Sequence, residues 1–280
     1  MIISVVISSY RGNEHLAKDC IRSLNTQSEP PSEIIVVLDT REEKDLFTRY
    51  LENSSQIPLT IVYSGKKGLA AARNKGIETS RGEIIAFIDD DALADNQWLG
   101  EIRKTFESSQ TAGVVGGPVS PIFEGHGIDE KFYWIIGCTS TSPPSDRPIG
   151  CNMAFRRDIF QKIGSFDENL GRIQKKLAIG EETELFLRIN QRLPGYSILL
   201  NHHAKVFHKT PPHRLTIRYF IKRAYEEGFS KARIRKEHRL RQEEKFLWYY
   251  FRHMDIRTLI VLCATGYGYL AGCFHVFGNE

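Results

Sequence analysis

The 280-residue chain lacks the patterns that mark several large protein classes. Its five cysteines are odd in number and include no C-x-x-C pair, which argues against a disulfide framework and against a zinc site. It has neither the G-x-G-x-x-G spacing of a dinucleotide site nor the G-K-[ST] of a P-loop. There is no internal repeat, and no basic leader precedes the first apolar run. We therefore expect no signal peptide and a reducing, cytosolic compartment.

A strong net charge is also absent, but the value of +4 conceals an asymmetry. Residues 205–257 contain 15 Lys and Arg against 6 Asp and Glu, whereas residues 1–204 contain 23 against 27. The basic excess therefore lies in one C-terminal stretch, which predicts an anionic surface as a partner. The length allows one large α/β domain with an appendage, or two small domains.

The first ninety residues alternate strand and helix patterns. Short β-branched runs predict buried strands, and the segments between them predict helices, the first of them capped at Asn13. The predicted strands are residues 2–8, 33–38, 59–63 and 83–88, and the predicted helices are residues 14–27, 42–53 and 69–79. This alternation predicts an α/β fold with a mainly parallel sheet, in which ligands bind beyond the carboxyl ends of the strands.

Three consecutive aspartates, Asp89, Asp90 and Asp91, follow the apolar run 83–88. Like charges at a sheet edge disfavour one another's ionisation, so the cluster is costly unless a cation neutralises it. We favour a divalent metal, Mn²⁺ or Mg²⁺, bridged to phosphate oxygens, because hard cations take carboxylate ligands. The alternative is that one aspartate caps the next helix while the others are solvated.

The ends of the neighbouring strands carry further polar groups. Ser8 ends the first predicted strand, Tyr10 follows it, and Asp39 follows the second. An aromatic ring can stack on a nucleobase, and a carboxylate can accept a base N–H. The small residues of 68–76 allow close approach of a ligand, and Arg73 among them suits a base or a phosphate. Each signal is weak alone, since Tyr10 could pack in the core and Asp39 could cap a helix.

The order and spacing of these motifs resemble those of family 2 glycosyltransferases, and among them the archaeal enzymes of dolichyl-phosphate-linked N-glycan assembly. Such enzymes have the GT-A fold, a single Rossmann-like domain that binds a nucleotide-sugar. The matching segments are residues 5–10, 33–39, 68–76, 82–91, 150–156, 166–168 and 180–185. The resemblance covers roughly residues 1–210, and it departs from the family at Ser8, Arg11 and Leu38, where relatives often carry Pro, Asn and Asp.

The resemblance implies roles for particular residues. The nucleotide-sugar-binding set would be Ser8, Tyr10, Asp39, Arg73, Asp89 and Asp90. Asp89 and Asp91 would be the D-x-D pair, with Asp91 the direct ligand of Mn²⁺ or Mg²⁺. His208 matches a position that in many relatives ligates the metal or contacts the diphosphate, although a lone histidine is more often structural or solvated.

The resemblance also implies a general base for inverting transfer to a hydroxyl. The family takes it from the second residue of a Glu-Asp pair at the start of a helix, and here Glu182 of the pair Glu181-Glu182 has that position. Glu181 and Asn152 would line the acceptor and sugar pocket. The alternative is that both glutamates only stabilise the N-terminus of the helix, and the two roles are compatible.

The C-terminal stretch predicts membrane association. Residues 211–255 are basic and aromatic, and residues 256–277 include the uncharged run Thr258 to Phe274 with a G-x-x-x-G at Gly268 and Gly272. We therefore divide the chain into a catalytic domain, residues 1–210, a membrane-proximal region, residues 211–255, and a hydrophobic segment, residues 256–277. A buried core helix is the alternative, and spanning the bilayer versus lying in its interface stays open.

Together these observations predict a metal-dependent, inverting glycosyltransferase. Its expected partners are a nucleotide-sugar donor of the UDP-linked class, a lipid-linked acceptor such as dolichyl phosphate or its glycan, and the cytoplasmic side of the cell membrane, with no nucleic acid. A phosphotransferase or phosphatase could also place a nucleophilic aspartate after a strand. A catalytically silent nucleotide-binding membrane protein is the other alternative.

Overall fold

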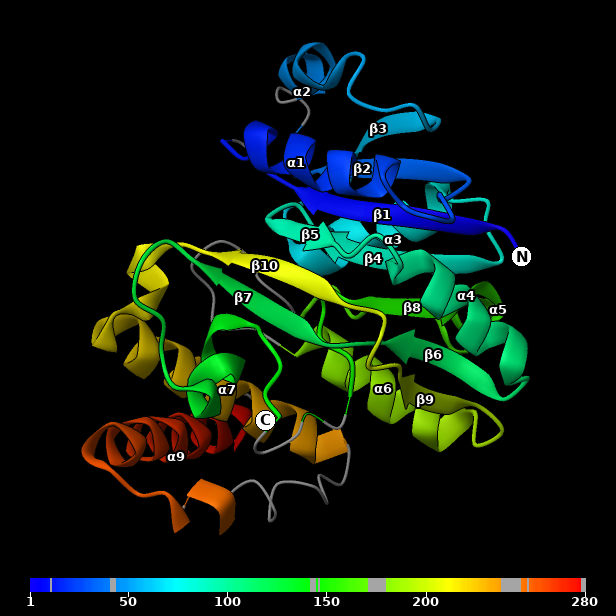
Figure 1. Cartoon of the computed structure of the whole chain (residues 1–280). Helices are drawn as coiled ribbons and strands as arrows, with labels where there is room; N and C mark the ends of the chain where they lie inside the picture. The colour runs from blue at the N-terminus through cyan, green and yellow to red at the C-terminus, as the bar shows by residue number, and fades with distance from the viewer. Residues whose placement is uncertain are drawn as a thin grey trace.

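The computed structural model describes residues 1–10, 12–40, 44–141, 145, 147–170, 180–237, 248–250 and 252–277. Within them, one sheet has the strand order β3-β2-β1-β4-β8-β6-β9, and a smaller sheet has the order β5-β10-β7 (Figure 1). The strands of the large sheet are β1 (Ile3–Ser9), β2 (Glu33–Leu38), β3 (Leu59–Tyr63), β4 (Ile84–Asp89), β6 (Ala112–Gly116), β8 (Met153–Arg156) and β9 (Ser197–Leu200). β8 runs antiparallel to both its neighbours, whereas the other pairs are parallel. The predicted mainly parallel α/β fold is confirmed.

Alternate side chains of the buried strands build a core on each face of the large sheet. The helices are α1 (Glu14–Asn25), α2 (Lys44–Leu51), α3 (Leu69–Thr79), α4 (Trp98–Ser108), α5 (Arg157–Ile163) and α6 (Glu181–Arg192). In β1, Val5 and Ile7 belong to the core that includes α1, α2 and α4, whereas Val6 belongs to the core that includes α3, α5 and α6. Because helices cover both faces of the sheet, both sides of these strands are buried, and their sequences are unbroken apolar runs.

The smaller sheet is built from β5 (Ala92–Ala94), β7 (Val119–Phe123) and β10 (Val206–Thr210). β5 begins directly after Asp91, and it pairs antiparallel with β10 so that Ala92 lies opposite His208. β1 and β4 are parallel, with Ser8 opposite Asp89. These two registers bring the end of β4 and the middle of β10 to the same edge of the molecule.

Two long helices follow the smaller sheet. α7 (Ile217–Glu237) and α9 (Ile256–Phe277) lie side by side at the lower end of the view, beside the 3₁₀ helix η1 (Glu130–Ile136) (Figure 1). A second 3₁₀ helix, η2 (Pro212–Leu215), precedes α7. A separate apolar cluster joins them, made of Phe132, Ile135, Phe220, Ala224, Tyr250 and Val261. In the described part of the chain, α9 is the one helix long and apolar enough to cross a membrane.

The structure also corrects details of the sequence prediction. The helix predicted for residues 14–27 ends at Asn25, and Asn13 does not cap it through its side chain. The Asn13 amide instead donates a hydrogen bond to Asp90 Oδ2, 3.0 Å away. Residues 42–43 of the helix predicted for 42–53, and residues 238–247 and 251 of the basic region, lie outside the described residues.

Candidate active site

The acidic strand end and a histidine from a distant strand form one cluster. Asp89 is the last residue of β4, Asp91 directly precedes β5, and His208 lies in the middle of β10. One ligand atom from each of the three lies within 4.8 Å of the others. Two carboxylates and an imidazole offer the oxygen and nitrogen donors that divalent metals take in proteins. The residues present therefore fit Mn²⁺ or Mg²⁺.

Arg214 also contacts this cluster, a contact that the sequence did not predict. Asp91 Oδ1 lies 3.2 Å from His208 Nε2, and Asp91 Oδ2 accepts from Arg214 Nη2 at 3.3 Å. Arg214 Nη1 lies 3.4 Å from the same histidine nitrogen. In the sequence Arg214 is one basic residue among many. It reaches Asp91 through the turn of η2, and no sequence motif predicts that contact.

Asp90 points away from its two neighbours. Its carboxylate is buried, and it accepts hydrogen bonds from Ser9 Oγ at 2.5 Å and from Asn13 Nδ2 at 3.0 Å. Burial, together with the charge of Asp91, raises the pKa of Asp90 to about 7, although the two hydrogen bonds oppose the shift. Asp90 thus ties the end of β1 and the start of α1 to β4.

A buried arginine links the acidic cluster to the first turn of α6. Arg73 of α3 is 2% exposed; its Nη1 donates to Glu181 Oε1 at 2.7 Å, and its Nη2 lies 3.7 Å from Asp89 Oδ1. The pair with Glu181 is enclosed, so water screens it little. In this arrangement Arg73 bridges two carboxylates.

Glu182 lies beside this bridge. A Cβ added at Gly150 would be 2.5 Å from Arg73 Nη2 and 3.4 Å from Glu182 Oε1, so the three residues meet in one place and a side chain at position 150 would displace the Arg73 guanidinium. Desolvation, reinforced by the charge of Glu181, raises the pKa of Glu182 to about 7, and Arg73 opposes that shift. A carboxylate that titrates near neutral pH is suited to accept a proton.

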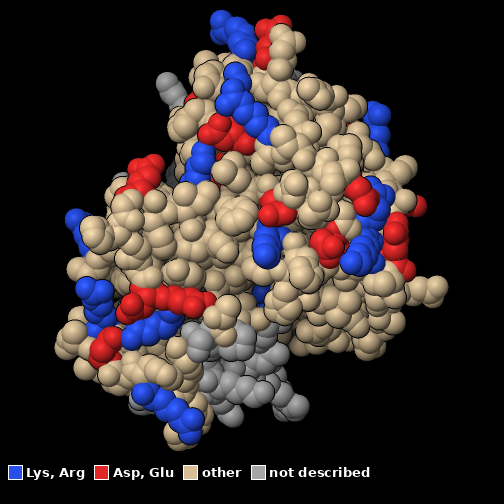
Figure 2. Space-filling model, viewed as in Figure 1, with Lys and Arg blue, Asp and Glu red and all other residues tan. Residues whose placement is uncertain are grey.

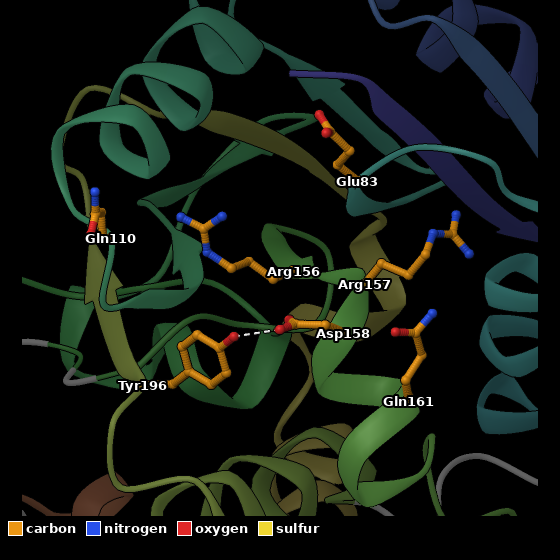
Figure 3. A pocket seen from close by; sticks show the side chains of 7 residues that line it. All are labelled: Glu83, Gln110, Arg156, Arg157, Asp158, Gln161 and Tyr196. Carbon is orange, nitrogen blue, oxygen red and sulfur yellow. Dashed lines mark hydrogen bonds between the residues drawn. The ribbon is translucent and has the colours of Figure 1, made fainter.

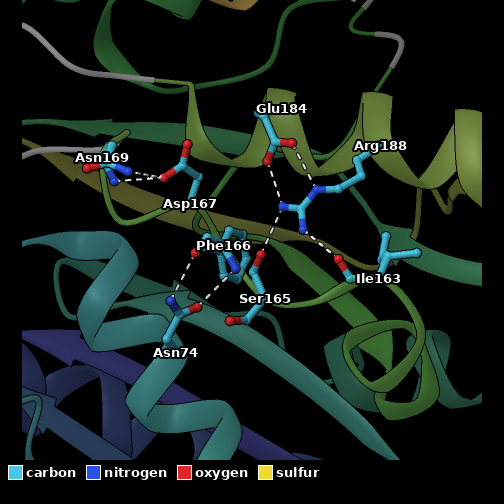
Figure 4. Close-up of polar contacts among 8 residues, drawn as sticks. All are labelled: Asn74, Ile163, Ser165, Phe166, Asp167, Asn169, Glu184 and Arg188. Atoms are coloured by element: carbon cyan, nitrogen blue, oxygen red, sulfur yellow. Dashed lines mark hydrogen bonds and ion pairs between the residues drawn. The ribbon is translucent and has the colours of Figure 1, made fainter. Parts of the chain in front are cut away.

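A polar network holds α6 in place (Figure 4). Arg188 of α6 donates to the backbone carbonyls of Ile163 and Ser165 at 2.8 Å each, and it forms an ion pair with Glu184 at 2.6 Å. On the other side of the same turn, Asn74 of α3 both donates to and accepts from the backbone of Phe166. The network thereby joins α3, which carries Arg73, to α6, which carries Glu182.

Comparison with known proteins decides the family. The model of the glycosyl transferase family 2 matches residues 4–164 of this chain, which is more than half of it. The chain is a family 2 glycosyltransferase.

This glycosyltransferase is 29% identical over 242 residues to the glucosyl-dolichyl phosphate glucuronosyltransferase of Haloferax volcanii, which covers 82% of this chain and 76% of that protein. It is 26% identical over 255 residues to the succinoglycan biosynthesis protein ExoM of Rhizobium meliloti, which covers 86% of this chain and 78% of that protein.

Two solved structures show the same fold. The mannosyltransferase PcManGT of Pyrobaculum calidifontis, in complex with GDP-Man and Mn²⁺, superposes with a TM-score of 0.62 at 19% identity, covering 99% of this chain and 78% of that one. Residues 1–349 of TarS from S. aureus, in complex with UDP-GlcNAc, give a TM-score of 0.56 at 12% identity, with coverages of 100% and 93%. These likenesses confirm the GT-A type of fold, and the family speaks against the phosphotransferase alternative.

The remaining residues of the predicted site fall into two groups. Ser8, Tyr10 and Asp39 lie at the ends of β1 and β2, with Tyr10 54% exposed, and burial raises the pKa of Asp39 although a hydrogen bond from Gly68 opposes the rise. Asn152 is fully buried instead: it accepts from Trp98 Nε1 at 2.8 Å and donates to the carbonyls of Pro118 and Ala204. These hydrogen bonds of the Asn152 side chain go to Trp98, Pro118 and Ala204, and its role in the acceptor and sugar pocket stays a prediction.

A cavity of about 420 Å³ lies elsewhere, near Glu83, Gln110, Arg156, Arg157, Asp158, Gln161 and Tyr196 (Figure 3). Glu83 precedes β4, so this cavity is at the opposite end of that strand from Asp89. Arg156 and Arg157 already donate to backbone carbonyls, for example those of Ala112 and Gly82. Because sheets of this type bind ligands at the carboxyl ends of their strands, we do not assign the donor to it.

Proposed function

We propose that this glycosyltransferase is metal-dependent and inverting, and that it moves a sugar from a nucleotide-sugar, UDP-linked in our expectation, to a lipid-linked acceptor. The acceptor class is dolichyl phosphate or a glycan carried on it. The catalytic domain, residues 1–210, would work on the cytoplasmic side of the cell membrane. Residues 211–255 would form the membrane-proximal region and residues 256–277 the hydrophobic segment.

The observation that carries the proposal is the chain of contacts from Asp89 through Arg73 to the pair Glu181-Glu182. It supports the proposal because it connects a cluster that fits a divalent metal to a carboxylate whose pKa is raised to about 7. In inverting transfer the base acts on the face of the sugar opposite to the leaving group, which this separation of roles allows. If Glu182 were far from the cluster of Asp89, Asp91 and His208, the structure would not support this mechanism.

Each group would have a defined part in the reaction. Asp89, Asp91 and His208 would hold Mn²⁺ or Mg²⁺, which neutralises charge on the departing diphosphate when bound. Glu182 would accept the proton of an acceptor hydroxyl. Arg73 and Glu181 would keep the Glu182 carboxylate in position, and Tyr10 and Asp39 would contact the nucleobase from the ends of β1 and β2.

Two findings support a lipid-linked acceptor. The Haloferax volcanii relative is, by its name, an enzyme that acts on glucosyl-dolichyl phosphate. In addition, α9 is an exposed apolar helix, with 22% of its candidate span buried, so a lipid carrier and the enzyme could meet at one surface.

The test is transfer by the full-length protein to defined lipids. A panel of UDP-glucuronate, UDP-glucose, UDP-N-acetylglucosamine and GDP-mannose is offered with Mn²⁺ and either dolichyl phosphate or glucosyl-dolichyl phosphate. We expect one pair to give a lipid product that is β-linked when the donor is α-linked, as read by NMR. An α-linked product would overturn the inverting assignment, and transfer confined to water-soluble acceptors would overturn the lipid acceptor.

The Glu182→Gln variant reports on the acceptor. Glutamine keeps the size of the side chain but removes its basicity, so transfer to a hydroxyl should fall about 10²–10⁴-fold, the usual range for a lost general base. A phosphate acceptor is already ionised, and its transfer should change little. Donor affinity, measured by titration calorimetry in the presence of Mn²⁺, serves as the control and should be retained in either case.

A further inference from the structure

α9 presents one continuous apolar stripe to the outside. The residues of the stripe recur every three or four positions and are all exposed: Ile256, Leu259, Cys263, Tyr267, Leu270 and Phe274. This spacing puts them on one face of the helix. The exposed fractions reach 70% at Ile256 and 75% at Phe274. An apolar face of this length on a soluble protein marks a binding surface.

The opposite face of α9 packs closely on α7 through glycines. A Cβ at Gly268 would overlap the carbonyl oxygen of Tyr225, and one at Gly272 would lie 2.6 Å from that of Phe229. From the other side, a Cβ at Gly228 would overlap the carbonyl oxygen of Thr265. The G-x-x-x-G pair of α9 is therefore used within the chain, where it lets two backbones approach closely.

This packing decides how α9 can meet a membrane. Ten of the 21 residues of α7 are charged. If α9 crossed the bilayer with α7 alongside, charged groups such as Glu226, Glu227 and Lys231 would be carried to the depth of the hydrocarbon, where charges are strongly disfavoured. If α9 lies flat, only its stripe enters the apolar layer, and the charges of α7 remain on the protein side.

Charge complementarity identifies the kind of membrane. Arg252 and Arg257 are exposed at the start of α9, and residues 205–257 carry the basic excess of the chain. In Figure 2, the lower left of the molecule, where Figure 1 places α7 and α9, shows Lys and Arg together with some Asp and Glu beside uncharged surface. Basic residues beside an apolar face favour anionic lipid headgroups.

We propose that the α9 stripe docks flat on an anionic lipid bilayer, with α9 lying in the interface and not across it. The inference concerns attachment to the membrane and goes beyond the reaction proposed above, on which it does not depend.

The proposal also has a consequence for the active site. α7 begins after Arg214, and near its end Ile234 Cδ1 would lie 2.7 Å from a Cβ at Gly180, the N-cap of α6. Both ends of α7, the helix on which α9 packs, therefore lie beside residues of the candidate active site.

Depth measurements distinguish the two orientations. Single cysteines at Leu259, Tyr267 and Phe274, in a Cys263→Ser/Cys273→Ser background, are labelled with a fluorophore. They are then quenched by lipids that carry nitroxides near the headgroup or near the chain end. A flat helix gives the same shallow depth at all three positions. A spanning helix would put position 267 deeper than the other two by about 10 Å, since each residue rises 1.5 Å, and that result overturns the proposal.

Vesicle flotation tests the stripe itself. The full-length protein should float with phosphatidylglycerol-containing vesicles, and Leu270→Glu should weaken the binding about 10- to 100-fold. The matched control is Leu46→Glu on α2, which is exposed to 46% against 57% for Leu270 and lies at the other end of the molecule. Equal binding by Leu270→Glu and wild type overturns the proposal. The proposal is also overturned if light scattering shows a dimer in the absence of lipid and Leu270→Glu dissociates it, because the stripe would then bind a second copy of the chain.

Discussion

At the residue scale, three adjacent aspartates have different surroundings. Asp89 and Asp91 join His208 in a metal-fitting cluster, whereas Asp90 turns inward to Ser9 and Asn13. Asp89 ends β4, and Asp90 and Asp91 form the turn into β5, where the carboxylate of Asp90 is directed away from the cluster that the other two form with His208. The D-x-D pattern follows from that geometry.

The first residue-scale prediction concerns Asp91. Asp91→Asn should reduce transfer by at least about 100-fold, because a metal site contributes several kcal/mol of charge stabilisation and each 1.4 kcal/mol is a factor of ten. Its melting temperature without metal should stay close to that of the wild type, since relieved repulsion among the carboxylates offsets the lost ion pair with Arg214. Mn²⁺ should no longer raise that temperature. Asp45→Asn on α2 is the control, and full activity of Asp91→Asn at saturating Mn²⁺ would remove Asp91 from the metal site.

The second prediction is a pH profile set by Glu182. The group must be ionised to accept a proton, and its pKa is about 7. For a hydroxyl acceptor, kcat/KM should therefore rise with pH, about tenfold per unit below pH 7, and level off above it. The Glu182→Gln variant should retain only a low kcat/KM, and this value should no longer rise with pH below pH 7. If the variant kept the same limb, the titration would belong to another group.

At the element scale, strand register and helix packing decide which residues meet. β10 pairs with β5 so that His208 lies opposite Ala92, one residue after Asp91. A shift of one residue would turn the His208 side chain to the other face of the sheet. On the catalytic side, Arg188 and Asn74 hold the turn at residues 163–166 between α3 and α6, which keeps Glu182 near Arg73.

The prediction at this scale uses two glycines of α9. Gly268→Ala should lower the melting temperature, because the new methyl group would overlap the carbonyl of Tyr225. Gly266→Ala is the matched control: among the described residues nothing lies within 4 Å of a Cβ there, and alanine in a helix interior is more stable than glycine by about 0.5–1 kcal/mol. The melting temperature, measured by thermal unfolding, should thus fall in Gly268→Ala and rise in Gly266→Ala. Equal shifts would contradict the close packing of α9 on α7.

At the scale of the whole molecule, the uneven charge orients the protein. Figure 1 places α2 and β3 at one end and α9 at the other, with the active site between them. Among the described residues of the basic stretch, α7, with seven Lys and Arg against three Glu in its sequence, packs along α9 at that end, and Arg252 and Arg257 are exposed there. An anionic surface would therefore attract that end and present the apolar stripe to the lipid.

The prediction at this scale is a salt-dependent attachment. Arg252→Gln/Arg257→Gln should weaken binding to anionic vesicles about 30-fold at low salt, from about 1 kcal/mol for each basic residue near the surface. The difference from wild type should shrink as salt rises to 1 M, where screening is strong. Lys104→Gln, at an exposed position on α4, is the control. A salt-independent difference would point to a structural effect of the two arginines.

The sequence by itself determined the α/β fold, the family and the acidic strand end. Buried strands and amphipathic helices are local patterns, and the order of the motifs, from Ser8-Ser-Tyr10 to the D-D-D run, survives in the linear chain. The element bounds followed within a few residues, as for the helix predicted to end at residue 27 that ends at Asn25.

Only the tertiary structure decided which polar groups meet. Arg214 reaches Asp91 through the turn of η2, Asn152 is enclosed by Trp98, Pro118 and Ala204, and α9 lies flat along α7 through its glycines. Each of these outcomes depends on the register or close packing of segments far apart in the chain. Spacing along the sequence cannot specify such contacts, because they form only when the sheets and helices close on one another.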